Sequence, residues 1–498
     1  MSVRHVALPL LAVLVAGCAV GPKYRPETPI PANTRVGADG GGSARAFFDS
    51  LAAAREADTL GDTLAAAGKA LAPRKLVADS LADLAWLDIL HDSTLVGLVQ
   101  TALRQNRDLQ VAVGRIREFR ALVGVARAPL FPSVTVNGSA ATNQVAIGSF
   151  PPTSYNALRA TADLAWELDF WGRIRQGVRA AQADEAEQEA TERSVLLSLV
   201  SDVASEYLQL LELDQERAIA ERTLASRQAT LALARQRFAQ GVISELDVRQ
   251  FEAQVAVPAA TLAQAERLRA QSEHRLNFLL GEVPMPVMRG GTLAAAVTAL
   301  AVPDSLPATL LERRPDVEAA ERAYAAATAR IGVAEASRLP TISITASYGT
   351  QSPSTNGLFT AGAEVYQLLG GISIPLFTGG RLINQTRVAR ARADQSRAQY
   401  EQTVLGALRE ASDALVAVRT ARDEVAAQQT QAQALRRALA LAELRYRTGV
   451  ASYVEVLDAQ RSLFDAELAL SRAQLQQLTG AVQLYKSLGG SWTGAPAK

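Results

Sequence analysis

Residues 231–242 read LALARQRFAQGV and residues 439–450 read LALAELRYRTGV, so one helical stretch and its closing glycine return 208 positions later. The same offset relates the whole of residues 98–281 to residues 306–489. It pairs the following glycines and prolines: Gly124 with Gly332, Pro132 with Pro340, Gly172 with Gly380, Gly241 with Gly449, and Gly281 with Gly489. Because these residue types mark backbone breaks, the matches predict one run of elements built twice. The chain is a tandem duplication.

Each copy contains a helix, a strand pair, a very long helix and a shorter returning helix. Residues 172–238 contain no proline and one internal glycine, Gly177, and a helix of that length spans ~100 Å. Apolar residues recur there at every seventh position, apart from Arg217. The series is Leu196, Val203, Leu210, Leu224, Leu231 and Phe238 in the first copy, and Val404, Ala411, Val418, Val425, Ala432, Leu439 and Tyr446 in the second. This spacing favours coiled-coil packing.

The predicted strand pairs are residues 133–145 with 157–170 and residues 341–352 with 357–377. Ile342, Ile344 and Ala346 alternate with polar residues, which is typical of a wall between lipid and water, or between a core and solvent. Asn143-Gln144 and residues 352–357 are expected to be exposed loops within the pairs. A sheet crosses a membrane only when it closes on itself, and small barrels need about eight strands. Copies of the chain must therefore pool strands, and the residues alone permit a dimer as well as a trimer.

The N-terminus has the pattern of an export signal. Arg4 and His5 precede an apolar run over residues 6–16 that is too short to span a bilayer, and Cys18 follows. The segment resembles a bacterial lipoprotein signal, in which cleavage leaves a lipidated first cysteine. Cys18 is the only cysteine, which excludes a disulfide within the chain. Ala19 stands where the resemblance would place an aspartate for retention in the inner membrane, so outer-membrane delivery is expected.

The predicted division of the chain follows from these features. Residues 1–17 form the signal peptide, and residues 18–90 form a lipidated extension and equatorial segment. Residues 91–297 form the first structural repeat, residues 298–489 the second, and residues 490–498 a C-terminal tail.

Composition and motifs argue against nucleic-acid binding and against catalysis. The chain has 51 Lys and Arg against 50 Asp and Glu, so no basic excess indicates a nucleic-acid partner. The three histidines, His5, His91 and His274, lack metal-ligand spacing. The sequence contains no phosphate loop, GxSxG elbow or HExxH pair. We therefore expect no enzyme, no catalytic residue, no metal and no cofactor beyond the covalent lipid on Cys18.

Ordered motifs run through nearly all of the mature chain except about residues 31–85. They are Cys18 with residues 21–26 (GPKYRP), 106–109 (NRDL), 130–133 (LFPS), 167–173 (ELDFWGR), 313–316 (RRPD), Leu339-Pro340, 375–377 (PLF), 379–381 (GGR) and 458–460 (DAQ). With these motifs the chain resembles the TolC-like outer-membrane efflux family, in its lipoprotein (OprM-type, NodT) branch. Their order and spacing together are highly specific.

The resemblance implies a mainly α-helical homotrimer. A twelve-stranded β-barrel in the outer membrane, with four strands from each chain, would continue into a long α-helical barrel in the periplasm. Such a lipid-anchored protein is the passive exit duct of a tripartite efflux system, with a periplasmic adaptor and an inner-membrane pump as partners. The alternatives are a non-conducting coiled-coil lipoprotein, the outer-membrane component of a type I protein secretion system, and a periplasmic adaptor. Drug, metal, peptide and protein cargo remain open.

The turn between the long helix and the returning helix is the candidate gate. Gly241 and Gly449 end the long helices, Asp247 and Glu455 correspond under the offset, and Asp458 follows one helical turn later. In a threefold tunnel each carboxylate becomes a ring of three that favours cations. The resemblance assigns the pore constriction to Asp458, Glu455 and Asp247.

The resemblance also implies that the helical barrel tapers to a gated end, the tip. Contacts made by Tyr446 and Asp247 would close this tip. An arginine latch found in some relatives is replaced by Ala451. The turns themselves are candidates for adaptor contact, through Gly241, Val242, Ser244, Gly449, Val450 and Ser452. Pro258 is expected to interrupt the returning helix of the first copy and to act as a hinge.

Overall fold

The computed structural model describes residues 20–22, 24, 35–37, 92–145, 152–297, 305–307, 313–450 and 452–490. These residues form two compact units. The sheet unit comprises Met1–Glu27, Val113–Ala190 and Glu318–Gln402, and the hairpin unit comprises Thr28–Ala112, Thr191–Val317 and Thr403–Lys498. Cys18 and Ala451 lie outside the described residues.

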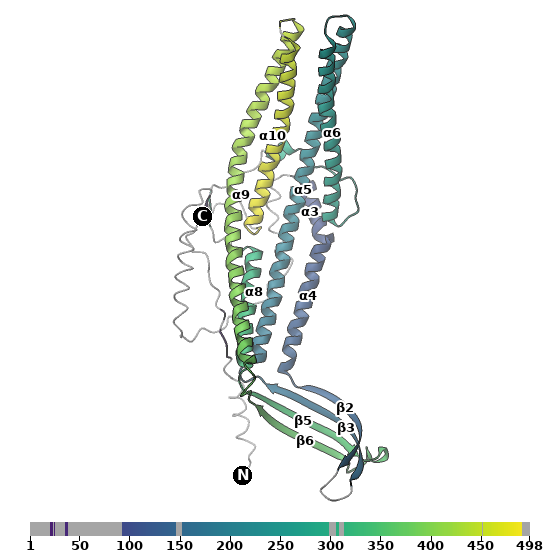
Figure 1. Cartoon of the computed structure of the whole chain (residues 1–498), viewed down its shortest axis with the longest axis vertical. Helices are drawn as coiled ribbons and strands as arrows, with labels where there is room; N and C mark the ends of the chain where they lie inside the picture. Colours follow the sequence, from purple (N-terminus) through teal and green to yellow (C-terminus); the bar gives the residue numbers. More distant parts are fainter. Residues whose placement is uncertain are drawn as a thin grey trace. The chain divides into compact units, whose positions relative to one another are not determined.

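The helices confirm the duplication (Figure 1). Helix α5 (Arg173–Ala239) and helix α9 (Arg381–Arg447) are both 67 residues long. They are preceded by α4 (Arg107–Arg127) and α8 (Pro315–Ala336) and followed by α6 (Glu245–Leu280) and α10 (Tyr453–Ser487). Helix α3 (Ser93–Gln105) lies before α4, and the short α7 (Leu293–Val297) follows α6. A second small sheet pairs β1 (Arg35–Gly37) with β4 (Ser305–Pro307).

Four long strands form one antiparallel sheet in the order β2-β3-β5-β6 (Figure 1). They are β2 (Ser133–Val145), β3 (Thr153–Leu168), β5 (Thr341–Ser352) and β6 (Glu364–Ser373). The 3-10 turns η3 (Ala128–Leu130) and η5 (Thr355–Gly357) precede β2 and β6. Each repeat supplies one hairpin, and the pairing of β3 with β5 joins the two hairpins.

The register places apolar residues together on one face of the sheet. Directly paired residues share a face, and one row across the four strands reads Val134, Leu164, Ala346 and Leu368. The adjacent row on the other face reads Thr135, Asp163, Ser347 and Gln367. The apolar face is uncovered, with Val136, Leu368 and Tyr366 exposed by 81%, 75% and 86%. A two-faced sheet of this kind suits a wall between lipid and water.

The strand boundaries differ from the prediction in three places. Asn143-Gln144 belongs to β2 and pairs with residues 154–155, so the expectation of a loop there was wrong. Strand β3 is shifted to residues 153–168, and β6 is confined to residues 364–373. Local propensity favours turns at Asn143, but the backbone hydrogen bonds of an extended antiparallel ladder outweigh it. Pro375 lacks the amide proton needed to continue a ladder.

In the hairpin unit, the seven-residue stripe packs as predicted except at Phe238, which is 45% exposed. Along α9, the stripe positions from residue 404 to residue 432 are all buried, as Val404, Ala411, Val418, Val425 and Ala432. Val425 and Ala432 pack against three residues of α10, namely Ala466, Leu470 and Ala473. In the first copy Val203, Leu210 and Leu231 are buried. The spacing of seven residues therefore locates the contacts that hold these helices together.

Helix α6 continues through Pro258, so the predicted interruption was wrong. A proline inside a helix removes one hydrogen bond and costs about 3 kcal/mol. Neighbouring packing offsets that cost, since Leu262 of α6 contacts a cluster that contains Ile219 of α5 and Phe464 of α10. Within the described residues, α5 is also the one helix apolar and long enough to cross a membrane, but half of that stretch is buried, as in a packed helix.

Candidate functional site

Both long helices end in the same hydrogen-bonded turn. After α5, Gly241 has φ +73°, and the amides of Gly241 and Val242 donate to the carbonyls of Phe238 and Arg237 at 2.9 Å. After α9, Gly449 has φ +75°, and the amides of residues 449 and 450 donate in the same way to residues 446 and 445. This is the Schellman motif, in which a left-handed glycine satisfies the last carbonyls of a helix. The turn glycines have the conformation predicted.

The returning helices begin differently in the two copies. Asp247 accepts hydrogen bonds from the Ser244 amide at 2.9 Å and from the Ser244 hydroxyl at 2.8 Å, and its own amide donates to Ser244 Oγ at 3.3 Å. These contacts form a capping box at the N-terminus of α6. The bond from the Ser244 backbone amide, followed by that from its side chain, lowers the pKa of the Asp247 carboxyl. Asp247 is thus ionised and bound within its own helix terminus.

In the second copy Ser452 makes no side-chain capping bond. Glu455, the counterpart of Asp247, instead forms an ion pair with Arg445 of α9 at 3.3 Å. Asp458 follows on α10, and both Glu455 and Asp458 are exposed. The two copies therefore hold their first-turn carboxylates in different ways. The assignment of the pore constriction to Asp458, Glu455 and Asp247 stays a prediction.

An aromatic cluster connects the two turns. The ring of Tyr453 at the start of α10 lies 3.9 Å from the ring of Phe251 on α6 and 5.3 Å from that of Tyr446 on α9, between centroids. Arg237 of α5 donates a hydrogen bond to the Tyr446 hydroxyl, and its guanidinium lies 5.0 Å from the centre of the Tyr446 ring. Burial raises the pKa of the Tyr453 hydroxyl, which stays protonated. Tyr446 is therefore in contact with the first copy, and its role in closing the tip stays a prediction.

Some of these contacts have a recognisable pattern in the sequence. Tyr446 and Tyr453 are seven residues apart, which in a turn between two stripe helices places both rings at the same end of the hairpin. Ser244 and Asp247 have the spacing of a capping box. No local pattern indicates that Arg237 or Phe251 would face the second copy, because these contacts depend on how the hairpins pack.

The turn residues proposed for adaptor contact are accessible. Val242 and Val450 are exposed, as are Leu246 and Val454 one helical turn further on. Ser244 and Ser452 are exposed as well. Exposed apolar side chains at a helical turn can bind the apolar face of a partner helix. Adaptor contact at Gly241, Val242, Ser244, Gly449, Val450 and Ser452 stays a prediction.

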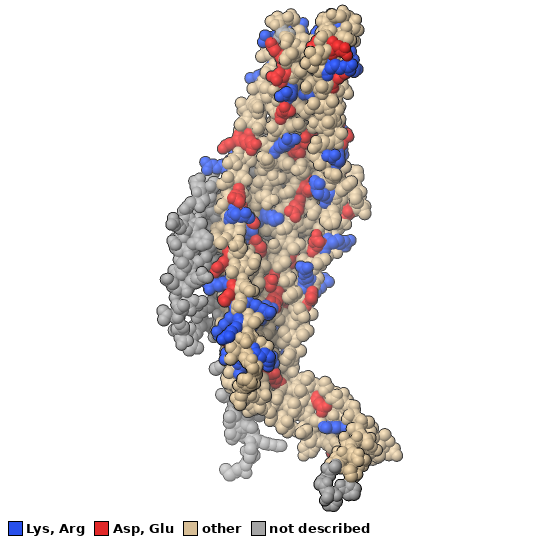
Figure 2. All heavy atoms as spheres, in the orientation of Figure 1, with Lys and Arg blue, Asp and Glu red and all other residues tan. Residues whose placement is uncertain are grey.

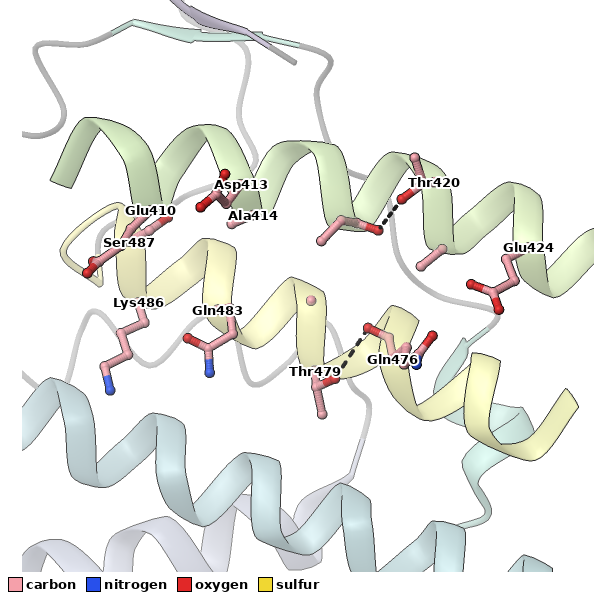
Figure 3. Close-up of a pocket in the computed structure, with 13 residues that line it drawn as sticks. Glu410, Asp413, Ala414, Thr420, Glu424, Gln476, Thr479, Gln483, Lys486 and Ser487 are labelled. Carbon is pink, nitrogen blue, oxygen red and sulfur yellow. Dashed lines mark hydrogen bonds between the residues drawn. The ribbon is translucent and has the colours of Figure 1, made fainter. Parts of the chain in front are cut away.

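A separate groove of about 630 Å³ lies between α9 and α10 (Figure 3). It is lined by small residues, among them Ala414, Ala421 and Gly480, and by charged residues such as Asp413, Glu424 and Lys486. Lys486 is 3.9 Å from Asp202. No histidine or cysteine lines the groove. Among the described residues, no group of three His, Cys, Asp or Glu could hold a metal ion.

Charged side chains of both signs are interspersed along the helices on the face seen in Figure 2. They are sparse over the strands on this face. Mixed charge on the helices suits a surface in water, and few charges on the strands suit contact with lipid.

Comparison with known proteins shows which family the chain belongs to. The sequence model described as "Outer membrane efflux protein" matches twice, over residues 98–282 and 306–490. The chain belongs to the outer membrane efflux protein family. The two matches begin 208 residues apart, as the two copies do. Members of this family are efflux ducts rather than enzymes, and the chain is the outer-membrane exit duct of a tripartite efflux system.

Relatives in Pseudomonas putida match nearly the whole chain. The solvent efflux pump outer membrane protein SrpC is 34% identical over 98% of this chain and 98% of its own length. The probable efflux pump outer membrane protein TtgC is 33% identical over 99% of this chain and 96% of its own. The solved structure of the outer-membrane channel OprN is 32% identical, with a TM-score of 0.75, over 82% of this chain and 92% of that one.

Proposed function

We propose that three copies of the chain form a lipid-anchored duct through which small molecules leave passively across the outer membrane. The observation that carries this proposal is the four-stranded sheet. Its apolar face is exposed, and among the described residues its outer strands β2 and β6 each pair on one side only. An unpaired strand edge in hydrocarbon costs several kcal/mol for each free backbone group. Copies of the chain must therefore complete the wall.

Three copies supply twelve strands, which is within the range of closed barrels, whereas two supply about the minimum of eight. The resemblance to the family favours the trimer. A non-conducting coiled-coil spacer would leave the apolar face of the sheet without a partner, which argues against that alternative. Planar-bilayer recording on the purified protein tests conduction: we expect discrete conductance steps, and an electrically silent protein that is correctly assembled would contradict a duct.

The duct would depend on its partners for energy, since the sequence contains no phosphate-binding loop and no catalytic motif. An inner-membrane pump would choose the cargo, and a periplasmic adaptor would join pump and duct. The relative SrpC is described as part of a solvent efflux pump, which supports small organic molecules over the protein cargo of type I secretion. We propose no enzymatic activity and no cofactor apart from a lipid on Cys18.

Rings of carboxylates at the tip would make the duct cation-selective. Asp458 and Glu455 are exposed on α10 one turn apart, and three copies of each would confine like charges. The double variant Asp458→Ala, Glu455→Ala should lower the cation-to-anion permeability ratio. Glu443→Ala is a control, because that carboxylate is paired with Arg447 of its own helix and should leave the ratio unchanged. An unaltered ratio in the double variant would refute the ring assignment.

The adaptor would bind at the turns. Cysteines placed at Ser244 and Ser452 should crosslink to an adaptor in whole cells, because both side chains are exposed at the ends of the hairpins. The native Cys18 would not compete for the reagent once it is lipidated. Capture at neither position would count against adaptor contact at the turns.

A further inference from the structure

The residues that follow Cys18 pack against the sheet unit of their own chain. The amide of Val20 donates to the carbonyl of Trp171 at 3.0 Å, and Gln176 Nε2 donates to the Val20 carbonyl at 3.4 Å. The Tyr24 hydroxyl donates to Glu321 Oε1 at 2.9 Å, and the Tyr24 ring meets Tyr324 edge-on at 5.6 Å. We call Val20, Gly21, Pro22 and Tyr24 the strap. It is held at both ends.

Two glycines let the strap approach this closely. Gly21 has φ +123°, and a Cβ atom on it would lie 2.4 Å from the Cα of Gly332 on α8. That distance is shorter than any tolerated carbon–carbon contact, and the obstacle is backbone, which cannot rotate away. The Cα of Gly332 in turn leaves room for Gln176, since a Cβ there would be 3.0 Å from the Gln176 side chain. Any larger residue at Gly21 would lift the strap off the surface.

The strap is specific for the second copy of the repeat. Glu321 and Tyr324 of α8 correspond, 208 positions earlier, to Val113 and Ile116 of α4, which offer neither an acceptor nor a ring. Gly332 corresponds to Gly124, and a Cβ at Gly124 would meet nothing within 4 Å. The duplication thus presents two similar helices, of which only α8 carries the groups that bind the strap.

We propose that the strap is a docking element that fixes the lipidated N-terminus at the junction of β3 and α5. Trp171 lies in this junction, between the end of β3 at Leu168 and the start of α5 at Arg173. Cys18 is two residues before Val20, so the Cα atoms of the two residues can be no more than about 7 Å apart. This part of the inference rests on the proposed lipidation of Cys18.

A docked lipid would bring the sheet to the membrane in an orientation suited to insertion. A lipid held at the end of β3 would enter the bilayer beside the sheet, where burial of its methylene groups in hydrocarbon is favourable. One chain would then be held at the membrane surface with its sheet in position to insert and to pair with other copies. A lipid on an undocked, flexible leader would anchor the chain without orienting the sheet.

Limited proteolysis of the full-length, detergent-solubilised protein tests docking directly. Trypsin cleaves after Lys23, between Pro22 and Tyr24 in the sequence. Because a protease binds residues on both sides of the bond that it cuts, cleavage requires Pro22 and Tyr24 to leave the surface. We expect the wild type to resist and Gly21→Ala to be cut at least tenfold faster, releasing the short N-terminal peptide seen by mass spectrometry. Gly124→Ala is the matched control, because its site is open, and it should resist like the wild type.

A second, milder variant tests docking even if Gly21→Ala fails to fold. Tyr24→Phe removes only the hydroxyl bonded to Glu321, and loss of a hydrogen bond to a charged group should speed cleavage about tenfold. Equal rates in the wild type, Gly21→Ala and Tyr24→Phe would overturn the proposal. Palmitate labelling of each variant separates the two ideas: failure to label the wild type would refute lipidation of Cys18 but would leave the cleavage rates as a valid test of docking.

Discussion

Arg227 of α5 and Leu435 of α9 occupy equivalent positions of the two copies, and both face the interior of their helical hairpins. Leu435 packs against the apolar cluster around Val425 and Ala432. Arg227 is 2% exposed; its Nη1 donates to the Gln254 carbonyl at 2.8 Å, and its guanidinium lies 5.4 Å from the ring centre of Phe464. Its Nε and Nη2 have no hydrogen-bond partner among the described residues. Burial lowers the pKa of Arg227, as expected of a cation without a bound carboxylate.

Replacing Arg227 with the residue of the other copy should therefore stabilise the hairpin unit. We expect Arg227→Leu to raise the free energy of unfolding by about 1–4 kcal/mol, because an apolar side chain replaces a buried charge that is poorly compensated. Thermal unfolding of the solubilised protein measures the change. Leu435→Arg is the reciprocal variant and should destabilise the protein. A lower midpoint for Arg227→Leu would mean that the guanidinium contributes more than its visible contacts suggest.

A buried carboxyl on the same helix makes stability depend on pH. Glu212 is 3% exposed, accepts from Ser471 of α10 and from Gln209 at 3.2 Å each, and lies near Glu216 and Arg472. Burial, together with the charge of Glu216, raises the pKa of Glu212 to about 7 from its ordinary value of 4.5. The positive charge of Arg472 opposes this rise in pKa, but Arg472 Nη2 also forms an ion pair with Glu216 Oε1 at 3.5 Å.

Because the pKa of Glu212 is raised in the folded protein, the free energy of unfolding falls as the pH rises. The folded protein binds the Glu212 proton more tightly than the unfolded chain does, so its contribution is complete below pH 4.5 and is lost as the pH rises through 7. The shift is equivalent to roughly 3 kcal/mol. We expect Glu212→Gln to reduce the difference in unfolding midpoint between pH 5 and pH 8. A variant with the same pH dependence as the wild type would show that another group titrates.

The two serine caps offer a matched pair of variants. Ser244→Ala should cost about 1 kcal/mol, since the Ser244 hydroxyl takes part in the capping box of α6. Ser452→Ala should cost much less, because the side chain of Ser452 makes no capping bond. Hydrogen exchange in the first turns of α6 and α10 measures both effects locally. Equal protection losses would contradict the difference between the two turns.

Much of the fold could be predicted because its signals are local and repeated. Gly241 and Gly449 predict the turns, since a left-handed glycine closes a helix whatever surrounds it. The stripe from Val404 to Ala432 predicts the buried side of α9 from spacing alone. The strand ends were less accurate, because the length of the ladder at Asn143 depends on its partner strand.

Other parts of the site depend on contacts between distant residues. The spacing of Ser244 and Asp247 could have shown that Asp247 caps its own helix, which competes with a role in closing the tip. The environment of Arg227, by contrast, requires knowledge of where Phe464 lies. Gly21 likewise shows its importance only beside Gly332, 311 positions further along the chain.

The central claim is that one chain carries too few strands to seal a barrel and completes it with other copies. Native mass spectrometry of the protein extracted from outer membranes in mild detergent tests this claim most directly. The account predicts a particle of three chains, each carrying an N-terminal lipid. A stable single chain as the extracted species would contradict it, because the exposed apolar face and the open edges of β2 and β6 would then need no partner.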